Sequence, residues 1–227
     1  MTPKKQKIDE SSSTRDAILD ATEEIMLNEG YAAVSSRRIG IKAGLKSKLL
    51  HYYFRSMDDL FIAAFQRLED RYDQRFARAV ASEHPIRELW KMNIDSASTG
   101  LIIEFIALAT HRQAIRALMA RSAKRDRSMH AAALAGIAER RVLRSAGPSP
   151  TILALFMASV ARTLVTERAL GVTDSHAEML AFVEQYIERM DSHTSRPIAP
   201  PVPGARDSSG GTPTKPRKKK AISKRSR

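Results

Sequence analysis

The spacing of apolar residues constrains this chain more than any other feature. Through most of residues 13–191, apolar side chains recur every three or four positions, and no convincing alternation of apolar and polar residues appears. Spacing of three to four places apolar side chains on one face of an α-helix, whereas a half-buried strand requires alternation. The sequence therefore predicts an all-α protein of about nine helices.

Glycine, proline and capping residues predict where these helices begin and end. Ser13 or Thr14 begins the first helix, and Gly30 ends it. Ser56 and Asp59 have the spacing of a capping box at the start of a long helix. The predicted helices are 13–29, 36–43, 46–53, 56–81, 86–97, 100–119, 122–145, 150–170 and 174–191.

The two ends of the chain differ from this helical part in composition. Residues 193–227 hold six of the ten prolines and ten basic side chains against one acid, out of a net charge of +13 for the whole chain. They contain too few apolar residues to offset the entropy cost of ordering, so we expect a disordered basic Pro-rich tail. Residues 1–12 are predicted to be a shorter disordered basic arm. We expect the tail to attach the protein to DNA non-specifically, to contact an acidic surface, or to serve only its solubility.

Missing motifs exclude several classes of protein. The chain has no Cys, no Gly-rich phosphate loop and no HExxH motif, and its six His residues lack the spacing of metal ligands. We therefore expect no enzyme, no metal site and no cofactor. No apolar run approaches the roughly 18 residues of a membrane span, and the N-terminus lacks the apolar segment of a signal peptide. We expect a cytoplasmic protein without a membrane partner.

Residues 35–55, SSRRIGIKAGLKSKLLHYYFR, hold six basic side chains and no acid. Two short helices joined through Ala43-Gly44-Leu45 have the form of a helix-turn-helix, since Gly44 can take the positive φ of the turn. In this motif the second helix enters the major groove of DNA. Gly40, within the first short helix, is expected to cost that helix up to ~1 kcal/mol relative to alanine.

Residues 14–60 resemble the DNA-binding domain of TetR-family transcriptional regulators. The resemblance lies in ILDATEEIMLNEGY, SSRRIGIKAGLKSKLLHYYF and RSMDDL, whose spacing is kept without gaps. It implies a helix-turn-helix domain at 13–57 and a helical domain for ligand binding and dimerisation at 58–192. It also implies a bacterial, nucleoid-associated homodimer that a small, mostly apolar effector releases from a near-palindromic operator. An architectural DNA-binding protein without an effector is the alternative.

Three sets of candidate site residues follow from these interpretations. Side chains that reach phosphates or base edges are predicted at the DNA interface: Ser35, Ser36, Arg37, Lys46, Ser47, Lys48, His51 and Tyr52. Aromatic and polar residues among apolar helices are predicted to contact a ligand: Trp90, Glu104, Phe105, Leu108, His111 and Phe156. The resemblance implies that the last two helices pair with their copies in a dimer, through Ala158, Arg162, Glu167, Phe182 and Tyr186.

Overall fold

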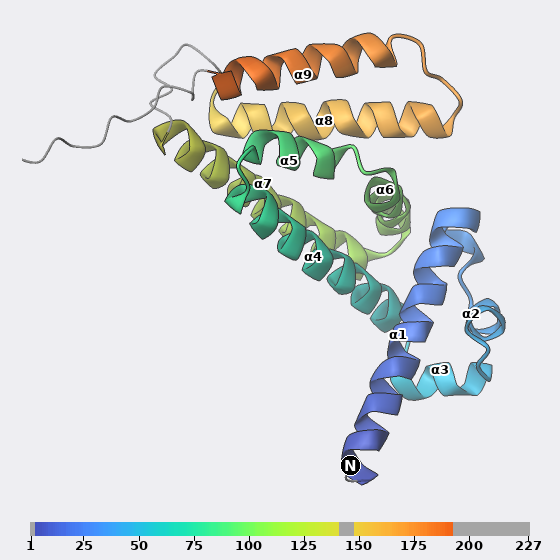
Figure 1. The fold of residues 1–227 in the computed structure, drawn as a ribbon. Coiled ribbons are helices and arrows are strands. Elements are labelled where there is room, and N and C mark those ends of the chain that lie inside the picture. Colours follow the sequence, from blue (N-terminus) through green and yellow to red (C-terminus); the bar gives the residue numbers. More distant parts are fainter. Residues whose placement is uncertain (1–2, 141–147, 193–227) are drawn as a thin grey trace, which may run out of the picture. The chain divides into compact units, whose positions relative to one another are not determined.

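The computed structural model describes residues 3–140 and 148–192, and within these residues it contains helices, turns and no strand (Figure 1). The all-α prediction is therefore confirmed. The helices of this part of the chain are α1 (Pro3–Glu29), η1 (Tyr31–Ala33, a 3-10 helix), α2 (Ser36–Ala43), α3 (Ser47–Tyr53), α4 (Met57–Ala81), α5 (Pro85–Asn93), α6 (Ser96–His111), α7 (Gln113–Arg140), α8 (Pro150–Ala169) and α9 (His176–Ser192). The tail predicted at 193–227 lies outside the described residues.

Helix α1 begins at Pro3 instead of Ser13, so residues 3–12, expected to belong to a disordered arm, are helical. Proline is tolerated in the first turn of a helix, where its missing N–H has no partner to lose. Neither proline nor glycine follows until Gly30. The serines at 11–13 are weaker helix formers than alanine but do not interrupt a helix. Nothing in this stretch therefore ends the helix.

The break between α6 and α7 lies at Arg112, whereas the sequence predicted it between residues 119 and 122. Arg112 is extended, with φ −130° and ψ 108°. Its guanidinium pairs with Asp58 at the start of α4 and lies 5.5 Å from the ring centre of Phe61. These partners are distant in sequence, which explains why no local breaker residue marks the break.

Two hydrophobic cores hold the helices together. The first joins α1, α2 and α3 to the first half of α4 and to α6, and it includes Leu19, Leu60 and Phe105. The second joins the end of α4 to α5, α7, α8 and α9 around Leu89 and Trp90. Since the first core draws on both sides of the predicted 57/58 domain boundary, packing continues across that boundary.

Ion pairs fix α1 against α4 beside the first core. The buried carboxylate of Glu23 forms ion pairs with Arg67 at 2.9 Å and with Arg71 at 2.7 Å. A buried carboxylate is tolerated when guanidinium groups compensate its charge. Helix α1 is thus held in a defined position, and the helix-turn-helix that follows it is held with it.

Candidate functional site

Helices α2 and α3 form a helix-turn-helix whose turn depends on two glycines. Gly44 has φ 67°, in the left-handed region that favours glycine. A Cβ on Gly40 would lie 2.8 Å from the carbonyl oxygen of Leu45, closer than such atoms approach in proteins. The absence of a side chain at Gly40 therefore lets the turn and the start of α3 pack on α2. Glycine at position 40 is unfavourable for helix formation, but this close approach leaves no room for a larger residue.

Helix α3 presents four of the predicted DNA contacts on one exposed face. Positions i, i+1, i+4 and i+5 lie on the same side of an α-helix. Leu50 points the other way, is 3% exposed and belongs to the first core. Tyr52 is 78% exposed and its ring meets the edge of the Tyr53 ring at 5.1 Å. The exposed face consists of Ser47, Lys48, His51 and Tyr52.

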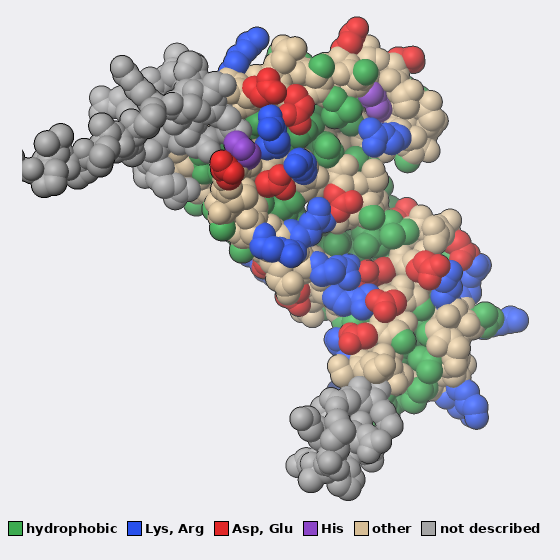
Figure 2. Space-filling model, in the orientation of Figure 1, with side chains coloured by type: hydrophobic (Ala, Val, Ile, Leu, Met, Phe, Trp, Pro, Cys, Tyr) green, Lys and Arg blue, Asp and Glu red, His purple; other side chains and the backbone are tan. Residues whose placement is uncertain are grey.

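The six basic side chains of residues 35–55 divide into two groups. Arg38 pairs with Glu29, and Lys42 pairs with Glu24 at 2.5 Å, so both contact acids of α1. The remaining four are exposed and have no ion pair among the described residues: Arg37, Lys46, Lys48 and Arg55. Figure 2 shows basic side chains projecting into solvent over α2 and α3. This surface therefore keeps positive charge available for phosphates.

The remaining predicted DNA contacts lie around the ends of these short helices. Ser35 caps α2 by accepting a hydrogen bond from the backbone N–H of Arg38 at 3.3 Å. Ser36 is half-buried, and its hydroxyl donates a hydrogen bond to Met57 Sδ at 3.9 Å. It is therefore less available than Ser35 for a contact with DNA. Lys46 precedes the first residue of α3 and makes no side-chain cap.

Arg55, exposed just after α3, was not among the predicted contacts. The sequence signal for Arg55 is its place in residues 35–55, a stretch that contains basic residues and no acid.

The comparisons with known proteins agree with this geometry. A family model described as "Bacterial regulatory proteins, tetR family" matches residues 18–64, which include the C-terminal part of α1, all of η1, α2 and α3, and the start of α4. Residues 18–64 thus match the N-terminal domain of TetR-family regulators. The helix-turn-helix of this chain is that of a DNA-binding transcriptional regulator.

Solved structures of transcriptional regulators resemble this chain in fold. A protein from Rhodococcus sp. assigned to the TetR-family transcriptional regulators is 20% identical, with a TM-score of 0.62, covering 77% of this chain and 99% of its own. A TetR transcription regulator from Haloarcula marismortui is 17% identical, with a TM-score of 0.59, covering 81% and 97%. Reduced NemR of Escherichia coli is 17% identical, with a TM-score of 0.64, covering 76% and 96%. Among curated proteins, none matches.

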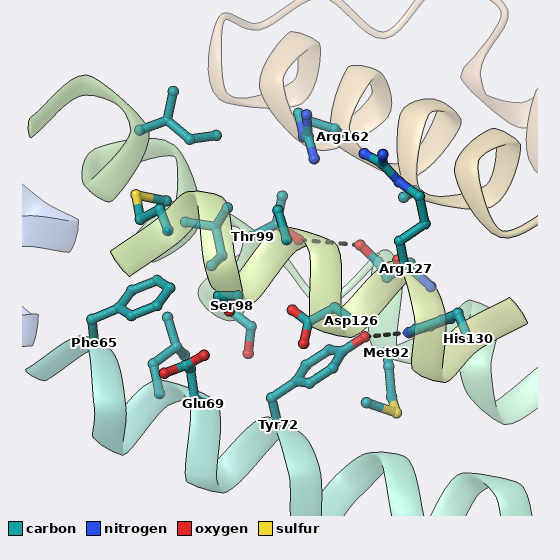
Figure 3. Close-up of a pocket in the computed structure, with 18 of the residues that line it drawn as sticks. Phe65, Glu69, Tyr72, Met92, Ser98, Thr99, Asp126, Arg127, His130 and Arg162 are labelled. Carbon is teal, nitrogen blue, oxygen red and sulfur yellow. Dashed lines mark hydrogen bonds between the residues drawn. The ribbon is translucent and has the colours of Figure 1, made fainter. Parts of the chain in front are cut away.

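A cavity of about 740 Å³ opens among α4, α5, α6, α7 and α8 (Figure 3). This volume lies within the range of small-molecule sites. Much of the wall is apolar, formed by residues such as Phe65, Leu68, Ile102, Ile106, Met119 and Leu155. The described part of the chain contains no cluster of three or more His, Asp or Glu side chains placed to hold a metal ion.

Tyr72 and His130 form a hydrogen-bonded pair in this cavity, with their rings stacked at 6.1 Å (Figure 3). Burial raises the pKa of the Tyr72 hydroxyl, and it lowers the pKa of the His130 imidazole. Both shifts favour the uncharged forms, so the pair is neutral near pH 7. It offers hydrogen bonds to a ligand without offering charge.

None of the six predicted ligand contacts is among the described residues that line this cavity. Trp90, Phe105 and Leu108 are at most 1% exposed and lie within the cores. Phe156 lies on α8 and is 43% exposed. The sequence identified a plausible set of bundle residues but carried no signal for the side chains that surround the cavity, among them Tyr72 and His130.

Glu104 and His111 contact the region next to the helix-turn-helix instead of the cavity. The backbone N–H of Tyr31 in η1 donates to Glu104 Oε2 at 2.7 Å. The rings of Tyr31 and His111 stack at 6.3 Å. Residues of α6 that line the cavity, such as Ile102 and Ile106, lie on other positions of the helix. Because α6 is apolar nearly all round, its sequence does not reveal which face meets which neighbour.

Replacing Glu104 with alanine is expected to lower the free energy of unfolding by about 1–2 kcal/mol, because the Tyr31 amide loses a charged acceptor. Glu104→Gln keeps an acceptor oxygen and should cost less. Urea unfolding followed by far-UV circular dichroism measures both changes. Exposed Glu178→Ala is the control. Equal stability of Glu104→Ala and wild type would contradict a stabilising role for this contact.

The five residues predicted at a dimer interface lie in different surroundings. Ala158 and Arg162 line the cavity. Glu167 forms a hydrogen bond with His176 Nε2 of the same chain at 2.8 Å. Tyr186 is half-buried against the second core, and Phe182 is 55% exposed.

Helices α8 and α9 nevertheless carry several exposed large apolar side chains. These are Ile152, Leu155, Phe156, Met179 and Phe182. Helix α8 is long and apolar, and only 33% of its most apolar stretch is buried. Such a helix has the length and composition of a membrane span, but core helices of soluble proteins share these properties. Apolar exposure on two neighbouring helices is also typical of a protein–protein interface.

Proposed function

We propose that this TetR-family regulator is a homodimeric repressor that binds a near-palindromic operator and leaves it when a small, mostly apolar ligand fills the cavity. Sequence-specific DNA binding is supported most directly by the exposed face of α3. Basic side chains that have no acidic partner among the described residues flank this face. One recognition helix contacts few base pairs, so two-fold symmetry is needed for a useful site. The exposed apolar residues of α8 and α9 support pairing of two copies through these helices.

Helix α6 supports a route from the ligand to the DNA-binding helices. Ile106 lies at the cavity, while Glu104 on the same helix bonds the Tyr31 amide beside the helix-turn-helix. A ligand that displaces α6 therefore moves the support of η1 and α2. For such a ligand to release DNA, it must bind the non-DNA-binding conformation more tightly than the DNA-binding one.

Selection of sites from a random duplex pool tests sequence-specific binding. We expect a near-palindromic sequence, with half-sites about one helical turn apart. Recovery of no preferred sequence would favour the architectural alternative. Transcription from a promoter carrying the selected site, with and without the protein, then tests repression.

Lys48→Ala is expected to weaken binding to that duplex by about tenfold and to reduce the slope of log affinity against log salt by about one. The reason is that Lys48 is exposed on α3 and has no ion pair among the described residues. Fluorescence anisotropy over a series of salt concentrations measures both quantities. Lys91→Ala is the matched control, because Lys91 lies on α5 and pairs with Glu88 at 2.7 Å. Unchanged affinity of Lys48→Ala would remove Lys48 from the interface.

A further inference from the structure

Five arginines line the cavity, and three of them have partners within the protein. Arg71 bonds Glu23 at 2.7 Å, and Arg75 bonds Asp95 at 2.5 Å. Arg116 donates to two backbone carbonyl oxygens near the end of α6, at 3.1 and 2.9 Å. These three guanidinium groups are therefore engaged in holding helices together.

Arg127 of α7 and Arg162 of α8 differ from the other three. Both side chains are exposed, and neither guanidinium has an ion pair or hydrogen bond among the described residues. Figure 3 shows both at the side of the cavity formed by α8, with Arg127 reaching from α7 toward that helix. Two guanidinium groups without acidic partners thus border one side of a largely apolar cavity.

The two acids that line the cavity do not compensate this charge. Glu69 and Asp126 both pair with Arg125, at 3.5 and 3.2 Å. Burial raises the pKa of Asp126, while the neighbouring Arg125 opposes the rise. The nearby Tyr72–His130 pair is neutral. Among the described residues, the cavity therefore has no unpaired acid for a cationic ligand, and it has two unpaired cations for an anionic one.

We propose that the cavity takes an apolar molecule carrying one carboxylate, with the carboxylate bound by Arg127 and Arg162. This proposal rests on the proposed function, in which the cavity is the effector site. Guanidinium binds carboxylate through paired N–H···O bonds, which are stronger than neutral hydrogen bonds. The apolar part of the molecule then lies against walls such as Ile102, Ile106 and Leu155.

Three probes that carry different head groups on linear alkyl chains of nine or ten carbons test the charge preference. Decanoate, 1-decanol and decyltrimethylammonium are titrated into the full-length protein by isothermal titration calorimetry, below any micelle-forming concentration. We expect decanoate to bind about tenfold or more tightly than either other probe, since only its head group forms charge-assisted hydrogen bonds with guanidinium. Equal affinity for decanoate and decanol, or no binding of any probe, would overturn the proposal.

Charge-removing variants test the two arginines themselves. Arg127→Gln and Arg162→Gln should each weaken decanoate binding by about tenfold and leave decanol binding unchanged. Arg121→Gln is the matched control, because Arg121 is exposed on α7 but does not line the cavity. Wild-type decanoate affinity in the two variants would contradict the assignment.

Binding of the selected operator by the same preparations separates the two proposals. If the wild-type protein does not bind DNA sequence-specifically, the proposed function is contradicted. Retained DNA binding without any preference for decanoate would contradict only the ligand class.

Discussion

Gly40→Val is expected to abolish sequence-specific DNA binding while leaving the helical bundle folded. A Cβ at position 40 already comes within 2.8 Å of the Leu45 carbonyl oxygen and 3.3 Å of the Ser47 amide nitrogen. Valine adds two methyl groups, so the turn and the first residues of α3 must move away from α2. Because the contacts of α3 with bases depend on its position in the groove, we expect affinity for the selected duplex to fall by about a hundredfold.

Fluorescence anisotropy on the selected duplex measures this loss, and circular dichroism shows whether the remaining helices persist. Ile41→Val is the control, because Ile41 is the next residue, lies on the same helix and is 73% exposed. Binding at wild-type affinity by Gly40→Val would show that α2 and α3 can separate without changing how the protein reads DNA.

Phe182→Asp is expected to convert the proposed dimer into a monomer. Phe182 lies on α9 and is 55% exposed, so the single chain should tolerate the change, whereas an apolar interface would have to bury an unpaired carboxylate. Sedimentation velocity at micromolar concentration should show the loss of the dimer. Affinity for the full operator should fall by about a hundredfold, because two linked half-site contacts become one.

Ile41→Asp provides the comparison for dimerisation. Ile41 is also apolar and is even more exposed than Phe182, but it lies on α2, away from α8 and α9. Its substitution should leave the sedimentation of the dimer unchanged. A wild-type protein that sediments as a monomer, or a Phe182→Asp variant that stays dimeric, would contradict an interface through this face of α9.

The features that the sequence predicts well are local. The Ser56–Asp59 capping box is present, with both of its hydrogen bonds at 3.1 Å. Gly44 takes the left-handed conformation that its place in the turn predicts. The four residues of the exposed α3 face follow from helical spacing once Leu50 is placed in the core. Each of these features depends on residues within one or two turns of each other, so their pattern is visible in the sequence.

The features that the sequence does not predict join distant segments. Arg112 ends α6 through contacts with α4, and Glu104 turns toward Tyr31 instead of a ligand. The cavity walls come from five helices, so no single stretch carries their signature. Apolar spacing says that a helix is buried, but it does not say against which neighbour.

The sequence by itself thus determined the helical class, the helix-turn-helix and the solvent-exposed face of α3, because capping and periodicity act over short distances along the chain. Only the tertiary structure decided which cations stay unpaired. Arg38 and Lys42 meet acids of α1, while Arg127 and Arg162 meet none among the described residues. The physical reason is that an ion pair requires two side chains within about 4 Å, and for distant residues that distance is set by packing.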